Sequence, residues 1–132
     1  MFRKAKSKLI NWKATSNKAL LVTGARQVGK TYIIREFLKE EFGEDNFIEF
    51  NLIENELAKT TIENSSNSED LLFRLSALTN KNMIKGKTII FLDEVQVCSN
   101  IITAIKFLVE DGSFRYILSG SLLGTELKDI KS

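Results

Sequence analysis

The eight residues from Gly24 to Thr31 fit the pattern G-x-x-x-x-G-K-[ST], which has the residue types and spacing of a phosphate-binding loop. Glycine lets the backbone turn so that successive N–H groups converge on an anion, and the N-terminus of the next helix adds partial positive charge. In this pattern the lysine, here Lys30, reaches the β- and γ-phosphates of a nucleotide, and the Thr31 hydroxyl binds Mg²⁺. The pattern predicts a Walker A loop for ATP or ADP; the alternative is a glycine turn with an incidental Lys-Thr pair. The predicted nucleotide-binding residues are Gly24, Ala25, Arg26, Gln27, Val28, Gly29, Lys30, Thr31 and Tyr32.

Two adjacent acids, Asp93 and Glu94, have the types expected of the second half of such a site. They follow four consecutive apolar residues, Ile89 to Leu92, as at the end of a buried strand. Ligands of open α/β sheets bind at the carboxyl ends of the strands. We therefore expect Asp93 to hold Mg²⁺ directly or through a water, and Glu94 to polarise the attacking water, as in the Walker B motif of a hydrolase. A solvated loop start is the alternative.

A hydroxyl at the end of another apolar run is the third candidate. Ser119, followed by Gly120 and Ser121, would lie near the γ-phosphate and sense whether it is present; the alternative is a turn of small residues. The single cysteine, Cys98, has no basic neighbour in sequence to lower its pKa and is predicted to be a small, buried or half-buried residue. The predicted catalytic residues are Glu94, Lys30 and Ser119, and the predicted metal ligands are Thr31 and Asp93.

Four short apolar runs are predicted to be the strands that position these residues. The runs at 88–92 and 114–118 are apolar without alternation, as in parallel strands that are covered on both faces. Helical patterns lie between the runs, so the order predicts βαβ units and a parallel sheet with right-handed crossovers. The predicted strands span residues 19–23, 46–50, 88–92 and 114–118.

The expected helix limits follow from capping residues. The helix that begins at Lys30 should end at Gly43, and the helix after Asn100 should end at Gly112. Ser66 followed by Glu69 resembles a capping box, so it is predicted to begin a further helix.

Composition restricts the classes of protein that remain. The chain has 132 residues and a net charge of +2, with no histidine and one cysteine, which makes a structural zinc site or an internal disulfide implausible. No apolar run approaches the roughly 18 residues of a membrane-spanning helix, and no signal peptide opens the chain, so a cytoplasmic protein is expected.

The charge is unevenly distributed. Residues 1–18 carry six bases and no acid, whereas residues 36–56 carry eight acids and one base. A basic helix over 1–17 and a core over 18–132 are therefore the predicted units. The helix could contact nucleic acid or anionic lipid, but no nucleic-acid-binding signature supports that interpretation. A solvated amphipathic helix with Phe2, Leu9 and Trp12 packed inward is favoured.

At these motifs the chain resembles the prokaryotic AAA-type ATP-binding proteins, whose phosphate loop reads G-[AP]-R-Q-V-G-K-T after a basic N-terminal helix. The acidic motif of that family, D-E-[IV]-Q, is matched by residues 93–96, its sensor-strand ending [ST]-G-S by residues 119–121, and its Asn-Leu pair by Asn51 and Leu52. The resemblance covers essentially the whole chain. It implies a three-layer, parallel-sheet P-loop NTPase of the additional-strand class with strand order 5-1-4-3-2.

Members of that family continue beyond the sensor strand with a fifth strand, a helical lid and a basic residue that acts on the γ-phosphate. This chain is therefore expected to be part of a larger AAA protein, cut before the fifth strand, and to associate with itself or with the rest of such a chain. Weak hydrolysis by the fragment alone is expected.

Three functions remain open at this point. The first is a Mg²⁺-ATP-dependent ATPase that drives conformational change in a larger protein. The second is a switch in which the nucleotide state gates an interaction and turnover is incidental. The third is a P-loop phosphotransferase, which the water-activating acid Glu94 disfavours. A GTPase is disfavoured because the base-reading Asn-Lys-x-Asp pattern does not occur.

Overall fold

The computed structural model describes residues 2–15, 18–24 and 29–121. Two short 3₁₀ turns, η1 (Glu44–Asn46) and η2 (Val95–Val97), accompany the helices and strands. In chain order the helices and strands are α1 (Phe2–Ala14), β1 (Ala19–Gly24), α2 (Lys30–Glu41), β2 (Phe47–Asn51), α3 (Glu56–Glu63), α4 (Ser68–Ser76), β3 (Ile89–Asp93), α5 (Ile101–Asp111) and β4 (Arg115–Ser121).

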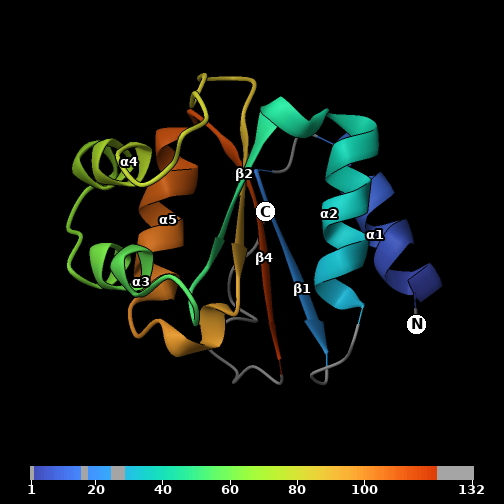
Figure 1. Ribbon diagram of the computed structural model, residues 1–132, viewed down its shortest axis with the longest axis horizontal. Helices are drawn as coiled ribbons and strands as arrows, with labels where there is room; N and C mark the ends of the chain where they lie inside the picture. Colours follow the sequence, from blue (N-terminus) through green and yellow to red (C-terminus); the bar gives the residue numbers. More distant parts are fainter. Residues whose placement is uncertain (1, 16–17, 25–28, 122–132) are drawn as a thin grey trace.

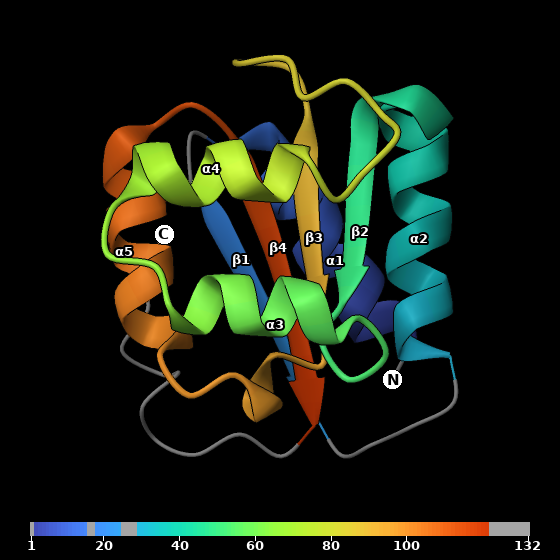
Figure 2. The ribbon, with the colours of Figure 1, turned by 60° about the vertical axis from the view of Figure 1, so that its left-hand side comes forward.

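The strands form one parallel sheet in the order β1-β4-β3-β2. Figure 2 shows the strands side by side in this order, behind α3 and α4. The order corresponds to the 1-4-3-2 part of the predicted arrangement, and the predicted parallel α/β class is confirmed. The strands predicted at 46–50, 88–92 and 114–118 each begin one residue later than expected.

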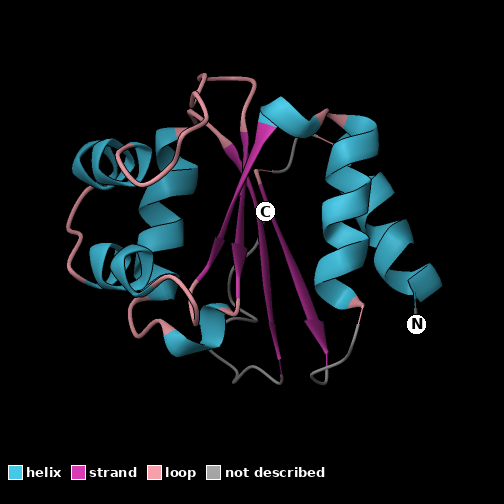
Figure 3. Cartoon of the chain, viewed as in Figure 1, coloured by secondary structure: helices cyan, strands magenta, loops and turns pink. Residues whose placement is uncertain are grey.

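Helices cover both faces of the sheet and make a three-layer structure. α1 and α2 lie on one face, and α3, α4 and α5 lie on the other (Figures 1 and 3). Successive side chains of a strand point to opposite faces, so β3 places Phe91 in the cluster under α1 and α2 and Leu92 in the cluster under the other helices. All five residues of β3 are buried, which explains its uninterrupted apolar run.

The predicted helix limits are confirmed at the end of α2 and wrong at the start of α4. Gly43 adopts a φ of 98° after α2, and its N–H donates to the carbonyl of Leu38, so the predicted end of this helix is confirmed. The predicted capping box at Ser66 is wrong. α4 begins at Ser68, and Asn67 caps it by accepting the N–H of Asp70 at 2.8 Å. Asparagine and serine are both strong capping residues, and the position of the first turn decided between them.

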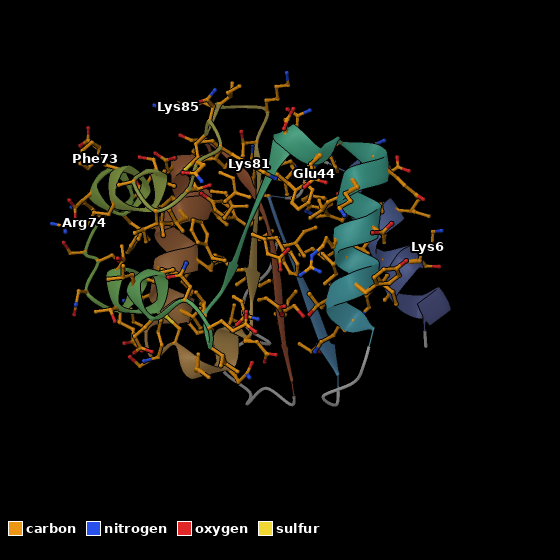
Figure 4. All side chains as sticks on the ribbon, viewed as in Figure 1. Lys6, Glu44, Phe73, Arg74, Lys81 and Lys85 are labelled. Carbon is orange, nitrogen blue, oxygen red and sulfur yellow. The ribbon has the colours of Figure 1, made fainter. Side chains whose placement is uncertain are left out.

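α1 is anchored to the rest of the fold by its apolar face. Leu9 and Trp12 are buried, as predicted, and Lys13 Nζ lies 2.6 Å from Glu41 Oε1 on α2. The guanidinium of Arg115 stacks 4.0 Å from the centre of the Trp12 ring. Lys6 lies on the exposed side of α1 and points away from the sheet (Figure 4). Within the described residues, no helix has both the length and the apolar character that crossing a membrane requires.

Candidate active site

The carboxyl ends of β1, β4 and β3 lie at the end of the sheet where α2 begins. In Figure 1 the arrows of β1 and β4 run toward the lower edge of the view, and the end of β1 lies near the start of α2. In the sheet register Ser119 lies between Val22 of β1 and Asp93 of β3. Paired residues of neighbouring parallel strands point to the same face, so Ser119 and Asp93 both face the α2 side of the sheet.

A hydrogen bond joins the two predicted motifs. The hydroxyl of Thr31 donates to Asp93 Oδ2 at 2.6 Å, although 62 residues separate the two in sequence. The other carboxylate oxygen, Oδ1, accepts the backbone N–H of Glu94 at 2.9 Å. Only 2% of Asp93 is exposed. Burial raises the pKa of this carboxyl above its ordinary value, the Thr31 hydrogen bond opposes the rise, and the nearby charges of Glu94 and Glu49 add to it.

The oxygens of Thr31 and Asp93 suit a hard cation. A hydroxyl and a carboxylate are ligands that Mg²⁺ accepts, and Mg²⁺ commonly takes one or two protein oxygens and fills its remaining positions with phosphates and waters. In the described part of the chain, no group of three or more His, Cys, Asp or Glu side chains is placed to hold a metal. These residues therefore fit a Mg²⁺ ion that is shared with bound phosphate better than an all-protein metal site.

Lys30 is directed across the carboxyl ends of the strands. Its Nζ donates to the carbonyl oxygen of Gly120 in β4 at 2.8 Å. The preceding Gly29 has a φ of 107°, a left-handed conformation that favours glycine. Tyr32, on the first turn of α2, is 63% exposed. Gly24 ends β1, whereas the remaining predicted loop residues, Ala25, Arg26, Gln27 and Val28, lie outside the described residues.

Glu94 has an unusual backbone conformation. With a φ of 59°, it is the one non-glycine residue of the described segments with a positive φ. A left-handed conformation costs a residue with a Cβ atom roughly 1–2 kcal/mol. The Glu94 carboxylate accepts a hydrogen bond from Gln96 Nε2 at 2.8 Å, which holds it beside the end of β3. Strain of this kind clusters at functional sites, so the outlier favours a role for Glu94 in chemistry.

Ser119 is buried without satisfying its hydroxyl. The residue is 0% exposed, and its Oγ has no hydrogen-bond partner within the described structure. Leaving a buried hydroxyl unpaired costs roughly 1–3 kcal/mol. The orphaned hydroxyl fits a site in which a polar ligand supplies the missing partner.

Two charged residues beside the site were not predicted from the sequence. Arg35 forms two hydrogen bonds with Glu49, from Nε to Oε1 at 2.8 Å and from Nη2 to Oε2 at 2.7 Å. The available signal was the position of Arg35 one helical turn after Thr31. The pair adjoins an open pocket of about 750 Å³. The residues that line this pocket are Arg35, Glu49, Asn51, Glu54, Asn55, Glu56 and Leu57.

Cys98 is not part of this site. It is buried, as predicted, and burial raises the pKa of its thiol to about 11. The thiol therefore stays protonated at neutral pH, which suits a packing residue and not a nucleophile.

Comparisons with known proteins bear on the family and the fold of this chain. A family model for the AAA domain matches residues 16–132. No curated protein matches the sequence. Among solved structures, the PCH-2 protein of C. elegans covers 97% of this chain at 16% identity and a TM-score of 0.48. The ORC2 protein of Aeropyrum pernix, solved in ADPNP-ADP complexes, covers 96% of this chain at 13% identity and a TM-score of 0.50, which shows a shared fold.

This chain covers 37% and 41% of the lengths of those two proteins, so it spans about two fifths of each. The family model, in contrast, extends over most of this chain and includes the strands, the loop and both acidic residues of the candidate site. The protein therefore belongs to the AAA domain family.

Proposed function

We propose that the chain binds Mg²⁺ with ATP or ADP at the loop from Gly24 to Thr31, and that ATP hydrolysis at this site drives conformational change in a larger AAA-type protein. The observation that supports the proposal most strongly is the 2.6 Å hydrogen bond between Thr31 and Asp93. It brings the hydroxyl of one motif to the carboxylate of the other, at the strand ends where nucleotides bind in open α/β sheets.

Each residue has a defined role in this proposal. Lys30 binds the β- and γ-phosphates, and Thr31 and Asp93 hold Mg²⁺, which when bound neutralises charge on the phosphates. Glu94 accepts the proton of the attacking water, with its carboxylate positioned by Gln96. The unpaired Ser119 hydroxyl donates to the γ-phosphate and senses its loss.

Substitution of the loop lysine tests nucleotide binding. Lys30→Ala removes a charge-assisted contact of a class worth roughly 1.5–3 kcal/mol, so affinity for Mg²⁺-ATP should fall at least about tenfold. Titration calorimetry measures the change. Lys39→Ala removes the same charge from the other end of α2, where Lys39 lies near Glu36 and Glu44, and should leave the affinity unaltered. Equal affinities for the parent and Lys30→Ala would exclude the loop as the binding site.

A further inference from the structure

The ion pair between Arg35 and Glu49 stands beside the candidate metal site and links two elements of it. Arg35 lies on α2 four residues after Thr31, so the two side chains share one face of the helix. Glu49 lies on β2 two residues before Asn51, the register partner of Asp93. Glu49 and Asn51 therefore point to the same face of the sheet, toward α2.

Arg35, Glu49 and Asp93 are within electrostatic reach of one another. The charge of Glu49 contributes to raising the pKa of Asp93, and the charge of Asp93 contributes to raising the pKa of Arg35, although Glu49 is the larger cause there. Both N–H groups that Arg35 directs at a carboxylate are bonded to Glu49. Asp93 instead accepts from the Thr31 hydroxyl and the Glu94 N–H.

The chemistry of arginine explains why it matters that Arg35 bonds Glu49 and not Asp93. A guanidinium matches a carboxylate with two parallel hydrogen bonds and remains charged at every accessible pH. A buried carboxylate attracts such a group more strongly than an exposed one, because the surroundings screen the charge less. An arginine released near Asp93 would therefore compete with a divalent cation for the same oxygens.

We propose that Glu49 sequesters the Arg35 guanidinium and thereby keeps the Asp93 carboxylate available to Mg²⁺. The inference rests on the proposed Mg²⁺-nucleotide site and makes Glu49 a positioning residue for it. A bidentate ion pair that only stabilises the fold is the alternative role, and it predicts no change in the Mg²⁺ requirement of nucleotide binding.

Three variants test the inference through the Mg²⁺ requirement of nucleotide binding. ADP affinity is measured on the purified chain over a series of Mg²⁺ concentrations, and also in EDTA. Glu49→Gln should raise the Mg²⁺ concentration that gives half of the maximal increase in ADP affinity at least about fivefold. The expected cause is that the variant frees Arg35 to approach Asp93. Affinity in EDTA should stay within about twofold of the parent. Arg35→Gln should not raise the requirement, and the double variant Arg35→Gln/Glu49→Gln should return it to the parent value.

A matched control and a stability measurement separate this role from general effects. Glu41→Gln removes the same charge and breaks another ion pair of α2, the one with Lys13, and should leave the Mg²⁺ requirement unchanged. Thermal unfolding in EDTA reports the fold of each variant. If Glu49→Gln folds poorly, Arg35→Gln is compared with the double variant instead. The inference predicts that the Mg²⁺ requirements of these two variants differ by no more than about twofold, the effect of the glutamate charge alone, because the arginine that Glu49 holds is absent from both.

Two results would overturn the inference while leaving the proposed function in place: an unchanged Mg²⁺ requirement in Glu49→Gln, or a double variant as impaired as Glu49→Gln alone. Failure of the parent chain to bind ADP at any Mg²⁺ concentration would instead overturn the proposed function, and the inference with it.

Discussion

At the scale of single residues, the candidate site is built from positions that reduce stability. Asp93 is a carboxylate that is almost fully buried, Ser119 is a buried hydroxyl without a partner in the described structure, and Glu94 holds a left-handed conformation. Each feature costs free energy that an Asn, an Ala or a Gly would avoid. Residues of this kind gather where a ligand or a reaction needs them. Their occurrence together at the carboxyl ends of the strands therefore supports the proposed function.

Removal of the buried charge should stabilise the chain in a pH-dependent way. The pKa of Asp93 is raised in the folded chain from an ordinary value of 3.8, so its contribution to stability is greatest below that value and falls as the pH rises through the folded pKa. At pH 8, without Mg²⁺ or nucleotide, Asp93→Asn should therefore raise the free energy of unfolding by about 0.5–2 kcal/mol, the range of single stabilising substitutions. The advantage should shrink toward pH 4.

Urea unfolding at both pH values measures this effect. Asp45→Asn removes an exposed charge of the same kind from η1 and serves as the control. A parent chain that is as stable as Asp93→Asn at pH 8 would mean that the Thr31 and Glu94 hydrogen bonds compensate the burial fully.

Glu94 is expected to govern turnover and not binding. In a longer parent protein that hydrolyses ATP, Glu94→Gln should retain nucleotide affinity and lower kcat roughly 10²-fold or more, because an amide cannot accept the proton of water. Phosphate release and calorimetry measure the two quantities separately. Glu110→Gln, on the exposed side of α5, should alter neither. An undiminished kcat in Glu94→Gln would remove this residue from the mechanism.

At the scale of elements, β1 is a terminal strand of the described sheet. It pairs with β4, and within the described residues no other strand pairs with it. The helices α1 and α2 cover one of its faces, since Leu9 of α1 and Ile34 of α2 join Val22 in one apolar cluster. Covering a face leaves the N–H and C=O groups of the outer edge without strand partners, and such an edge favours pairing with another chain.

We therefore expect the 132-residue chain to associate with itself along β1. Of the amides of Leu20, Leu21 and Val22, those that point away from β4 should exchange slowly only at concentrations where light scattering detects a dimer or a larger species. Amides of β3, a central strand, should be protected at every concentration and are the internal reference. A strictly monomeric chain in which the β1 amides that point away from β4 are protected would contradict the expectation.

At the scale of the whole molecule, the three layers place the candidate site at the carboxyl ends of the strands and engage three arginines elsewhere. Arg35 binds Glu49, Arg74 binds Asp70 at 2.9 Å on α4, and Arg115 donates to the carbonyl of Trp12. Stabilisation of the γ-phosphate by a further basic group contributes roughly 10³–10⁵ in rate in related phosphoryl-transfer enzymes. In the described structure these three arginines therefore bind protein groups away from the position expected for the γ-phosphate.

The 132-residue chain by itself is thus predicted to hydrolyse ATP slowly, well below about one turnover per second, the lower end of the usual range of kcat. Phosphate release from the purified chain, compared with that of a longer parent protein at equal concentration, measures the difference. The Glu94→Gln variant of the same chain supplies the background rate. Turnover near one per second would show that these residues suffice for catalysis.

Several local features of this protein could be predicted from short stretches of its sequence. The strand at 88–92 was predicted within one residue of β3, and the end of α2 was predicted at Gly43, because apolar periodicity and helix-ending glycines act over a few residues. Type and spacing also predicted the loop from Gly24 to Thr31 and the pair Asp93 and Glu94 as site residues, and their roles stay a prediction. The exact capping residue of α4 was missed because two neighbouring residues compete for the same bond.

The contacts between these parts depend on the folded arrangement of the whole chain. The hydrogen bond from Thr31 to Asp93, the register of Asp93 with Ser119 and the pairing of Arg35 with Glu49 all join elements that are distant along the chain. Such contacts depend on the order of strands in the sheet and on which face of each helix packs inward. Those choices minimise the free energy of the whole core, and no segment of the chain encodes them alone.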